Sequence, residues 1–533
     1  MKKIFTLSAA IIFSVNGFSQ APAIQWQKCF GGISADVASS IQLTNDGGYI
    51  VAGCTSSNDG DVSGNHGGID CRVLKLDSVG NIEWQKCLGG TSYDVAYSIQ
   101  TTDDGGYIVA GVTTSNDGDV SGWHSGYDSM GNPLHDCWIL KLDSIGNILW
   151  QKCLGGTNAD GANSVQQTTD GEYIVAGWSN SYDGDATGNH GNIDCWIVKL
   201  DSVGNIQWQK SLGGTNADVA NSVQETVNGG YIVAGSSNSN SGDVTGNHGN
   251  YDYWVVKTNS IGNIQWQKSL GGTDADAANS VLQTVDSGYI VVGYTRSENG
   301  DVSGSHDTSG FSSDYWVVKL DTAGNVQWQR CLGGTSSDHA YSIQQSADGG
   351  FILVGLTGSN DGDVSGYHGG PDYWIVKTDY SGQIQWQKCL GGTNGDIAYS
   401  VQQTNDGGYI LAGKTGSYDG DVSGNHGGVN DFWIVKLSPD VGIEEHNPLS
   451  SINISPNPAT SEITVHPDFY RDKVESIEVY NVMGERVIFS LNPSPSPAGE
   501  GSASMDVSKL AAGIYFVKVL TENGMSAAKF VKQ

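Results

Sequence analysis

The sequence predicts an all-β protein, a seven-bladed β-propeller followed by a small C-terminal β-sandwich. A phrase centred on Trp26 returns with a period of 58 residues, stretched once to 66 and once to 62, at Trp84, Trp150, Trp208, Trp266, Trp328 and Trp386. Each repeat contains four strand-like runs separated by turns rich in Gly, Asp and Asn. No segment shows the 3.6-residue period of an amphipathic helix.

The first 19 residues have the pattern of a secretory signal peptide. Two lysines at the start precede an apolar run from Ile4 to Val15, and small residues lie before Gln20. We expect cleavage after Ser19. No other stretch reaches the ~20 apolar residues that a membrane helix needs, so no transmembrane segment is expected in the mature protein.

Residues 20–437 are assigned to the propeller because the four runs of each repeat differ in character. The first has small side chains, which suits a crowded central axis. The second and third are continuously apolar, as in strands covered on both faces. The fourth alternates between apolar and polar residues, as in an outer strand. The chain begins with an outer run, Ile24 to Phe30, which is expected to complete the seventh blade.

The alternative arrangement is a string of seven small β units or a linear solenoid. A repeat of 58 residues cannot bury its apolar faces alone, which favours a closed ring. A ring also leaves only short exposed strand edges.

Beyond a predicted linker at residues 438–451, the segment 452–533 has a small β pattern with three motifs. These are Ser455-Pro-Asn-Pro-Ala459, Val479-Tyr-Asn-Val-Met-Gly484 and Leu510 to Val519. In this order they resemble the type A C-terminal sorting domain of the type IX secretion system of Bacteroidetes. The resemblance implies that the type IX machinery is a partner, and that the product is secreted or attached to the outer-membrane surface.

A net charge of −31 excludes several classes of partner. A nucleic-acid backbone or an anionic membrane surface would repel most of the molecule, so we expect no nucleic-acid partner.

The loop between the second and third runs of each repeat is the main candidate for a metal site. Its oxygen side chains at positions 1, 3 and 5, a Gly at 6 and a carboxylate at 12 are similar to the calcium loop of EF-hands. The predicted Ca²⁺ ligands are Asp59, Asp61, Ser63 and Asp70; Asp117, Asp119, Ser121 and Asp128; Asp183, Asp185, Thr187 and Asp194; and Asp361, Asp363, Ser365 and Asp372. The alternative is that these side chains form Asx-type turns.

The other three loops fit the pattern less well. The fourth has Ser241 at position 1, the fifth has Asn299 there and Gly310 at 12, and the seventh has Asn430 at 12. These loops are expected to bind the ion poorly.

Several further residues recur once per repeat, and each is interpreted as structural. A His at loop position 8 is expected to hydrogen-bond within its own blade, because seven separated imidazoles cannot converge on one zinc ion. An Asp before each inner run is expected to cap turn amides. A third-run Trp is expected to pack between blades. Arg72 replaces it in the first repeat, so that blade is expected to pack differently.

The chain has nine Cys residues. A hairpin centred on Val79 would place Cys71 opposite Cys87, and the same count would place Cys137 opposite Cys153. Disulfides at these positions remain open, and no Cys is expected to act as a nucleophile.

The order of the runs places the long loops at one mouth of the ring and the tight turns at the other. Two repeats carry insertions at the long-loop mouth, and a single ligand would need such unrepeated residues. The candidate ligand-binding residues are Trp123, His135, Asp307 and Phe311. The alternative is that these insertions drift freely, because extra loop length costs little free energy.

These observations favour a monomeric, non-enzymatic binding or adhesion module for an extracellular glycan or protein, with calcium stiffening the loops. The alternatives are a polysaccharide hydrolase or lyase with its site in the same mouth, and a structural component of a surface layer. An enzyme needs catalytic groups in unequal environments. Nearly identical blades give their carboxylates similar surroundings, so no catalytic residue is assigned.

Overall fold

The computed structural model describes residues 20–306, 311–440, 452–467, 474–481, 486–491, 503–521 and 524–532. The predicted signal peptide, Asp307 and residues 441–451 of the predicted linker lie outside these ranges. The chain divides into two units, Met1–Asp440 and Val441–Gln533. Among the described residues, no helix is long and apolar enough to cross a membrane.

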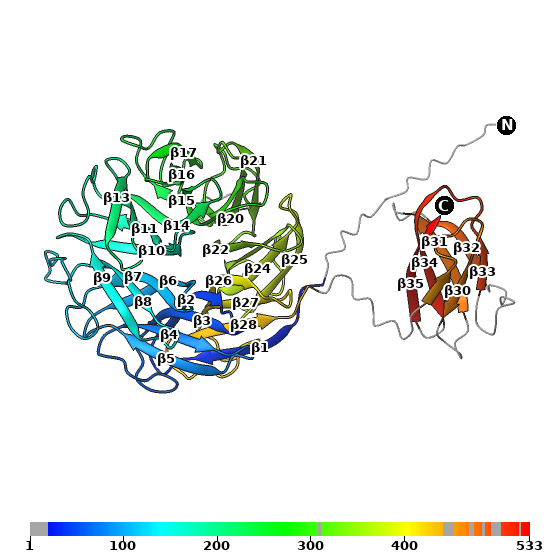
Figure 1. Ribbon diagram of the computed structural model, residues 1–533, viewed down its shortest axis with the longest axis horizontal. Coiled ribbons are helices and arrows are strands. Elements are labelled where there is room, and N and C mark those ends of the chain that lie inside the picture. Colours follow the sequence, from blue (N-terminus) through cyan, green and yellow to red (C-terminus); the bar gives the residue numbers. More distant parts are fainter. Residues whose placement is uncertain are drawn as a thin grey trace, which may run out of the picture. The chain divides into compact units, whose positions relative to one another are not determined.

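The first unit contains seven four-stranded antiparallel sheets arranged around a central axis (Figure 1). The innermost strands are β2 (Asp36–Leu43), β6 (Asp94–Thr101), β10 (Asp160–Gln167), β14 (Asp218–Thr226), β18 (Asp276–Gln283), β22 (Asp338–Gln345) and β26 (Asp396–Gln403). The second strands are β3 (Tyr49–Thr55), β7 (Tyr107–Thr113), β11 (Tyr173–Ser179), β15 (Gly230–Ser237), β19 (Tyr289–Thr295), β23 (Phe351–Thr357) and β27 (Tyr409–Thr415).

The third strands are β4 (Asp70–Leu76), β8 (Asp136–Leu142), β12 (Asp194–Leu200), β16 (Asp252–Asn259), β20 (Asp314–Leu320), β24 (Asp372–Thr378) and β28 (Asp431–Leu437). The outer strands are β5 (Ile82–Leu88), β9 (Ile148–Leu154), β13 (Ile206–Leu212), β17 (Ile264–Leu270), β21 (Val326–Leu332), β25 (Ile384–Leu390) and β1 (Ile24–Phe30). We number the blades 1 to 7 from the blade that begins with β2.

The ring closes as the sequence predicts. Strand β1 pairs antiparallel with β28, so the first ordered strand is the outer edge of the last blade. Each innermost strand contacts that of the next blade, and β26 contacts β2. Residues just past β28 also belong to this unit, since Trp386 Nε1 and the Tyr409 hydroxyl both donate to the Asp440 carboxylate, at 2.8 and 2.5 Å.

Blades pack through two aromatic contacts that recur around the ring. Each outer-strand Trp lies against the second-strand Tyr or Phe of the following blade, with ring centroids 5.7–6.4 Å apart. Each third-strand Trp is fully buried, and its Nε1 donates to an outer-strand Gln at 2.8–3.0 Å. The packing role predicted for these tryptophans is therefore observed.

Arg72 occupies the position of this Trp in blade 1. It is fully buried, and its guanidinium lies 5.1 Å from the ring centroid of Phe432 in blade 7. Its Nη2 donates to Gln85 Oε1 at 3.2 Å, which is the contact that Trp Nε1 makes in the other blades. Arg72 thus fills the same slot as the Trp, with a buried charge in place of the indole.

The predicted facing of Cys71 with Cys87 and of Cys137 with Cys153 is wrong. The β4–β5 register places Cys71 opposite Leu88 and Arg72 opposite Cys87, and β8–β9 has the same offset. The cause is a β-bulge near Leu76, which adds one residue to the outer strand and shifts every later pair. All nine cysteines are free.

A third-strand Lys of each blade is buried near the tight turns. Six of these lysines pair with a turn aspartate, as Lys75 does with Asp46 at 2.8 Å. In blade 4 the turn has Asn228 instead, and Lys257 Nζ donates to the Thr258 carbonyl at 2.7 Å. Burial lowers the pKa of Lys257 to about 8.

We expect Asn228→Asp to restore this pairing. The substitution should raise the free energy of unfolding by about 1 kcal/mol, measured by urea titration, and should raise the pKa of Lys257. Val227→Asp adds the same charge to the same turn at a side chain that is 85% exposed, and is the matched control. Equal effects of the two substitutions would contradict the expectation.

The second unit has two sheets, in the strand orders β29-β30-β33 and β32-β31-β34-β35. Its strands are β29 (Ile452–Ser455), β30 (Glu462–Pro467), β31 (Val474–Asn481), β32 (Arg486–Leu491), β33 (Ala503–Asp506), β34 (Gly513–Thr521) and β35 (Gly524–Lys532). Both sheets contribute to one buried core that includes Ile463, Val479 and Phe530. This is the small β-sandwich that the sequence predicts.

Candidate functional site

The two faces of the propeller differ as the strand order requires. The long loops between second and third strands meet the outer-to-inner connections on one face, where Asp61 N donates to the Gly31 carbonyl. The tight turns lie on the other face, where those of blades 1 and 2 line a shared groove. We call the face with the long loops the loop face.

In this structure, the predicted calcium ligands at the different loop positions mostly interact with different protein groups. At position 1, Asp59, Asp117, Asp183 and Asp361 each accept a backbone N–H from the neighbouring connection. At position 3, Asp61, Asp119, Asp185 and Asp363 each donate a backbone N–H to that connection. At position 5, Ser121, Thr187 and Ser365 accept from outer-strand glutamines, and Ser63 is exposed. At position 12, Asp70, Asp194 and Asp372 accept from the His at position 8.

These contacts do not fit an EF-hand-like site. Calcium needs six to eight oxygen atoms around one point. Among the residues that the structure describes, no group of three or more His, Cys, Asp or Glu side chains could hold a metal ion. Calcium binding stays a prediction that the observed contacts do not favour.

Asp128 has a different position from its predicted counterparts. Its carboxylate accepts the backbone N–H groups of Met130 and Asn132, at 2.8 and 2.9 Å, within the inserted turn. The equivalent of Asp70 in blade 2 is Asp136, which begins β8. Insertions shift the count in the same way in blades 5 and 7, so that Asp314 and Asp431 take the places assigned to Gly310 and Asn430.

As a result, all seven blades carry a His–Asp pair on the loop face. The Nδ1 atom of the His lies 2.7–3.2 Å from the buried carboxylate that begins the third strand. In four blades Nε2 also lies 3.2–3.8 Å from a loop aspartate of the following blade. The histidines thus hold loops within and between blades, as the sequence predicts for their own blade.

A second ring of carboxylates begins the innermost strands. Asp36 accepts hydrogen bonds from the Thr55 and Ser57 hydroxyls and from the backbone N–H of Gly32. The corresponding aspartates of the other blades accept the same backbone N–H and a hydroxyl. These contacts agree with the predicted capping role.

We expect the propeller to be more stable at pH 5.5 than at pH 7.5. Burial raises the pKa of Asp338 and Asp372 to about 6, and the hydrogen bond that His306 donates to Asp314 is the main cause of the raised pKa of His306. A group with a raised folded-state pKa stabilises the fold at low pH and loses this effect as pH rises through that pKa. The melting temperature should therefore fall by about 2–4 °C over this interval.

The gain in stability on lowering the pH should turn into a loss only in stronger acid. Although burial opposes it, hydrogen bonds from Lys75 and Thr44 lower the pKa of Asp46 to about 2, so its contribution is lost only near that pH. The double substitution Asp338→Asn and Asp372→Asn should flatten the profile between pH 5.5 and 7.5. A melting temperature that rises across this interval in the wild type would contradict the expectation.

The central channel is where the sevenfold repeat is broken most clearly. The fourth, seventh and eighth side chains of every innermost strand are at least partly exposed. We call the space around the ring axis that these strands border the channel. At the fourth residue of these strands, blades 3, 4 and 5 have Asn163, Asn221 and Asn279, whose side-chain amides donate to the next innermost strand at 2.8–2.9 Å. Blades 2, 6 and 7 have tyrosines there instead, namely Tyr97, Tyr341 and Tyr399.

Two of the channel tyrosines, Tyr341 and Tyr399, form an aromatic surface with residues of the loop face. The Tyr341 and Tyr399 rings lie 5.1 Å apart. His339 stacks on Tyr294 at 4.3 Å, and burial, followed by the charge of Arg296, lowers the pKa of His339 to about 4. The neutral imidazole belongs to the aromatic surface.

Of the predicted ligand-binding residues, His135 ends the blade 2 insertion and Trp123 lies beside it. Trp123 Nε1 donates to the Leu134 carbonyl at 3.0 Å, and its ring lies 5.7 Å from that of Tyr127. The His135 ring lies 5.3 Å from the ring of Tyr93, which directly precedes β6, the strand that carries Tyr97. The insertion therefore approaches the strand that carries Tyr97 through one ring contact. Phe311 is 86% exposed.

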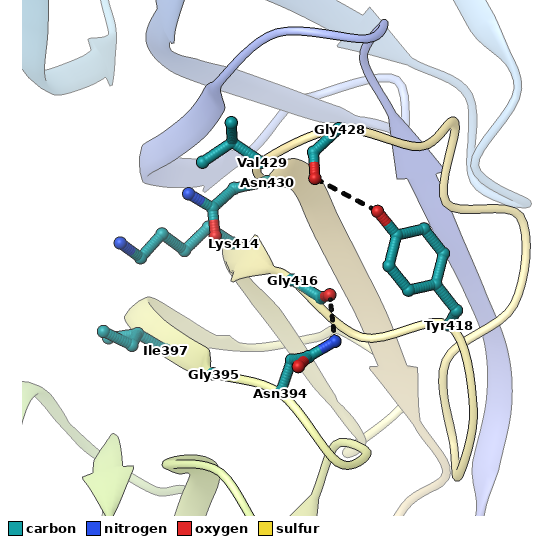
Figure 2. A pocket seen from close by; sticks show the side chains of 9 residues that line it. All are labelled: Asn394, Gly395, Ile397, Lys414, Gly416, Tyr418, Gly428, Val429 and Asn430. Atoms are coloured by element: carbon teal, nitrogen blue, oxygen red, sulfur yellow. Dashed lines mark hydrogen bonds between the residues drawn. The ribbon is translucent and has the colours of Figure 1, made fainter.

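A pocket of about 450 Å³ opens on the loop face in blade 7 (Figure 2). It is lined by Asn394, Gly395, Ile397, Lys414, Gly416, Tyr418, Gly428, Val429 and Asn430. Lys414 and Ile397 are register partners on β27 and β26, and they extend in the same direction. The Tyr418 hydroxyl donates to the Gly428 carbonyl at 3.1 Å on the opposite side.

Sequence reasoning missed this pocket and the channel tyrosines. An alignment of the repeats could have drawn attention to Lys414, because it shows which cations are not repeated. Lys and Arg recur at one outer-strand and one third-strand position of every blade. In the propeller, three further cations fall outside this pattern, namely Arg72, Arg296 and Lys414.

Comparison with known proteins shows partial similarities for the body of the chain. A stretch of 233 residues is 27% identical to the regulatory protein FlaEY of Caulobacter vibrioides, covering 41% of this chain and 23% of that protein. Similar solved structures include the WD40 domain of Neurospora crassa Pan2, with TM-score 0.42, 13% identity and coverage of 75% of this chain and 89% of that chain. Sqt1 from Chaetomium thermophilum has TM-score 0.37 and 11% identity, with coverage of 83% and 98%.

The C-terminal unit gives a specific match. Residues 453–533 match the family described as the secretion system C-terminal sorting domain. The motifs that predicted this domain lie in the same segment. The chain is therefore a propeller exported by the type IX secretion system, and it is secreted or attached to the cell surface.

Proposed function

We propose that the exported propeller is a non-enzymatic binding module that holds a glycan or protein ligand at the loop-face mouth of its channel. The observation that carries this proposal is the position of the departures from sevenfold repetition. Tyr97, Tyr341 and Tyr399 lie on one side of the channel, and three asparagines lie on the other. A single ligand needs unrepeated residues, whereas packing alone is served by the repeated ones.

The surroundings of the tyrosines suit recognition. Aromatic surfaces with polar tips are favoured in binding sites, because they offer a large contact area and a hydrogen-bonding group. Tyr97 is 37% exposed, and Tyr341 and Tyr399 are partly exposed, so a ligand can reach them. The blade 2 insertion and the blade 7 pocket lie on the same loop face, which adds further unrepeated residues.

The carboxylates of the loop face do not favour catalysis. The innermost and third-strand aspartates are buried and accept hydrogen bonds from hydroxyl, His or backbone groups. The same arrangement recurs from blade to blade, which supports the binding module over a hydrolase or lyase.

The test is glycan-array binding by the full chain after removal of the signal peptide. The double substitution Tyr341→Ala and Tyr399→Ala should weaken binding about 10- to 30-fold. The control is Val227→Ala with Val285→Ala, two exposed residues in tight turns on the opposite face, which should leave binding unchanged.

Two further arms separate the alternatives. Depolymerisation of a bound polysaccharide would replace the binding module with an enzyme, and equal binding by the tyrosine variant would place the site elsewhere. Repeating the array with EDTA tests calcium, and the contacts described above lead us to expect unchanged binding.

A further inference from the structure

The blade 7 pocket exists because this blade combines three features that occur together in no other blade. Gly395 replaces residues that carry a side chain, namely Ala35, Tyr93, Ala159, Ala217, Ala275 and Ser337. Gly416 replaces Ser, Thr, Asn or Arg in five blades; a Cβ there would lie 3.4 Å from Asn430 Oδ1 and from the Val429 carbonyl. The loop from His426 to Asp431 is also one residue longer than that from His66 to Asp70.

A single uncompensated cation lines this pocket. The residues that line it include Lys414 and no acidic residue, in a chain of net charge −31. In the other blades, the residues at the position of Lys414 are Cys54, Val112, Trp178, Ser236, Tyr294 and Leu356. Within the part of the chain that the structure describes, Lys414 forms no ion pair, whereas six of the seven third-strand lysines do.

The carboxylates on the segments that border this pocket are each hydrogen-bonded to, or paired with, a group other than Lys414. Asp396 accepts the Ser417 hydroxyl at 2.8 Å. Asp431 lies 2.7 Å from His426 Nδ1, and Asp419 accepts the backbone N–H of Thr393 at 2.8 Å. The Lys414 ammonium is thus left to attract an anionic group that enters from solvent, and such a group would form a charge-assisted hydrogen bond with it.

We propose that the blade 7 pocket binds a carboxylated sugar unit of an acidic glycan, with Lys414 holding the carboxylate. This deepens the proposed function and rests on it. The remaining lining suits a sugar, because the Asn430 and Asn394 amides can hydrogen-bond to hydroxyls. Tyr418, which is 53% exposed, offers a face for the ring. A size of about 450 Å³ lies in the usual range of small-ligand sites.

The experiment uses calorimetric titration of the full chain, after signal-peptide removal, with oligogalacturonate and its methyl ester. The two probes have the same sugar backbone and differ in charge. Hyaluronan and alginate oligosaccharides extend the test to other uronic acids. The wild type should bind at least one of the three acids, and oligogalacturonate about tenfold more tightly than its ester. Its affinity should fall as salt rises.

Variants then assign the preference to the pocket. Lys414→Gln should remove the preference for acid over ester, and Lys414→Arg should retain most of it. Arg296→Gln is the matched control, because Arg296 is also an unrepeated exposed cation on the loop face but does not line the pocket. Gly416→Asn, which adds the side chain found at this position in blades 3 and 4, should weaken binding of every acidic probe by filling the pocket.

The outcomes distinguish this inference from the proposed function. Binding to none of the three uronic acids, equal affinity for acid and ester, or an unchanged preference in Lys414→Gln would overturn the acidic-sugar site. If a neutral glycan still binds in a way that depends on Tyr341 and Tyr399, the binding module stands without it. An equal loss of preference in Arg296→Gln would indicate general attraction by the mouth and would also overturn the pocket assignment.

Discussion

Deleting residues 20–30 should abolish cooperative unfolding of the propeller and cause aggregation. The deletion removes β1, so β28 keeps its pairing with β27 but has an unpaired outer edge along its full length. An exposed apolar strand edge pairs readily with other chains. The deletion also removes Gln27, which accepts a hydrogen bond from Trp433 Nε1 at 2.8 Å. It removes Trp26 as well, whose ring centroid lies 5.9 Å from that of Tyr49 in blade 1. Tryptophan fluorescence during urea titration, with light scattering, measures both effects.

The repeat offers a matched control for this deletion. Residues 24–30 can be placed after Leu437 through a copy of the turn at residues 77–81, which joins the third and outer strands in blade 1. This permuted chain has the same β28–β1 pairing without closure by the N-terminus, and it should recover a cooperative transition. All 15 tryptophans lie before residue 441, so fluorescence reports on the propeller alone. A deletion variant that unfolds like the wild type would show that the closing strand is dispensable.

Replacing Arg72 with Ala should lower the free energy of unfolding by about 3–5 kcal/mol. The side chain is fully buried between blades 1 and 7, and its Nη1 lies 4.0 Å from the buried Asp36 carboxylate. Removing it leaves a cavity against Phe432 and an Asp36 carboxylate without its cation. Urea titration followed by tryptophan fluorescence gives the change in free energy.

Arg72→Trp tests whether this position needs a large buried side chain or a positive charge. Six blades place a buried Trp here with Nε1 bonded to an outer-strand Gln, and Gln85 is available in blade 1. Asp36 accepts the same hydroxyl and backbone N–H hydrogen bonds as its counterparts in the six blades with a buried Trp, so this variant should match the wild type. Arg330→Ala, at a partly exposed outer-strand Arg, should cost about 0.5 kcal/mol. Equal losses for Arg72→Trp and Arg72→Ala would show that the charge itself is needed.

The repeat made the propeller predictable to the level of strands. The spacing of Trp26 and its counterparts located all seven units, and the character of each run ordered the strands from axis to rim. The incomplete first and last units indicated the closing strand. These features are local in the sequence, because alternation, apolar runs and turn residues reflect how each strand is covered.

Register was less accessible, since single inserted residues change it. Counting across the hairpin placed Cys71 opposite Cys87, but a β-bulge moved the partner to Leu88. Counting twelve positions along the blade 2 loop led to Asp128, whereas the residue equivalent to Asp70 is Asp136 at the start of β8. Aligning on the Asp that directly precedes each third strand, rather than on loop length, would have found the seven His–Asp pairs.

The sequence by itself determined the number of blades, the strand order, the exported destination and the two faces, because each depends on patterns within a repeat or on local motifs. Only the tertiary structure decided which residues meet. The aromatic surface joins Tyr294, His339, Tyr341 and Tyr399 from three blades, and the hollow beside Lys414 forms where two glycines and a lengthened loop come together. Contacts of this kind depend on positions far apart in the chain, which no period or spacing within one repeat specifies.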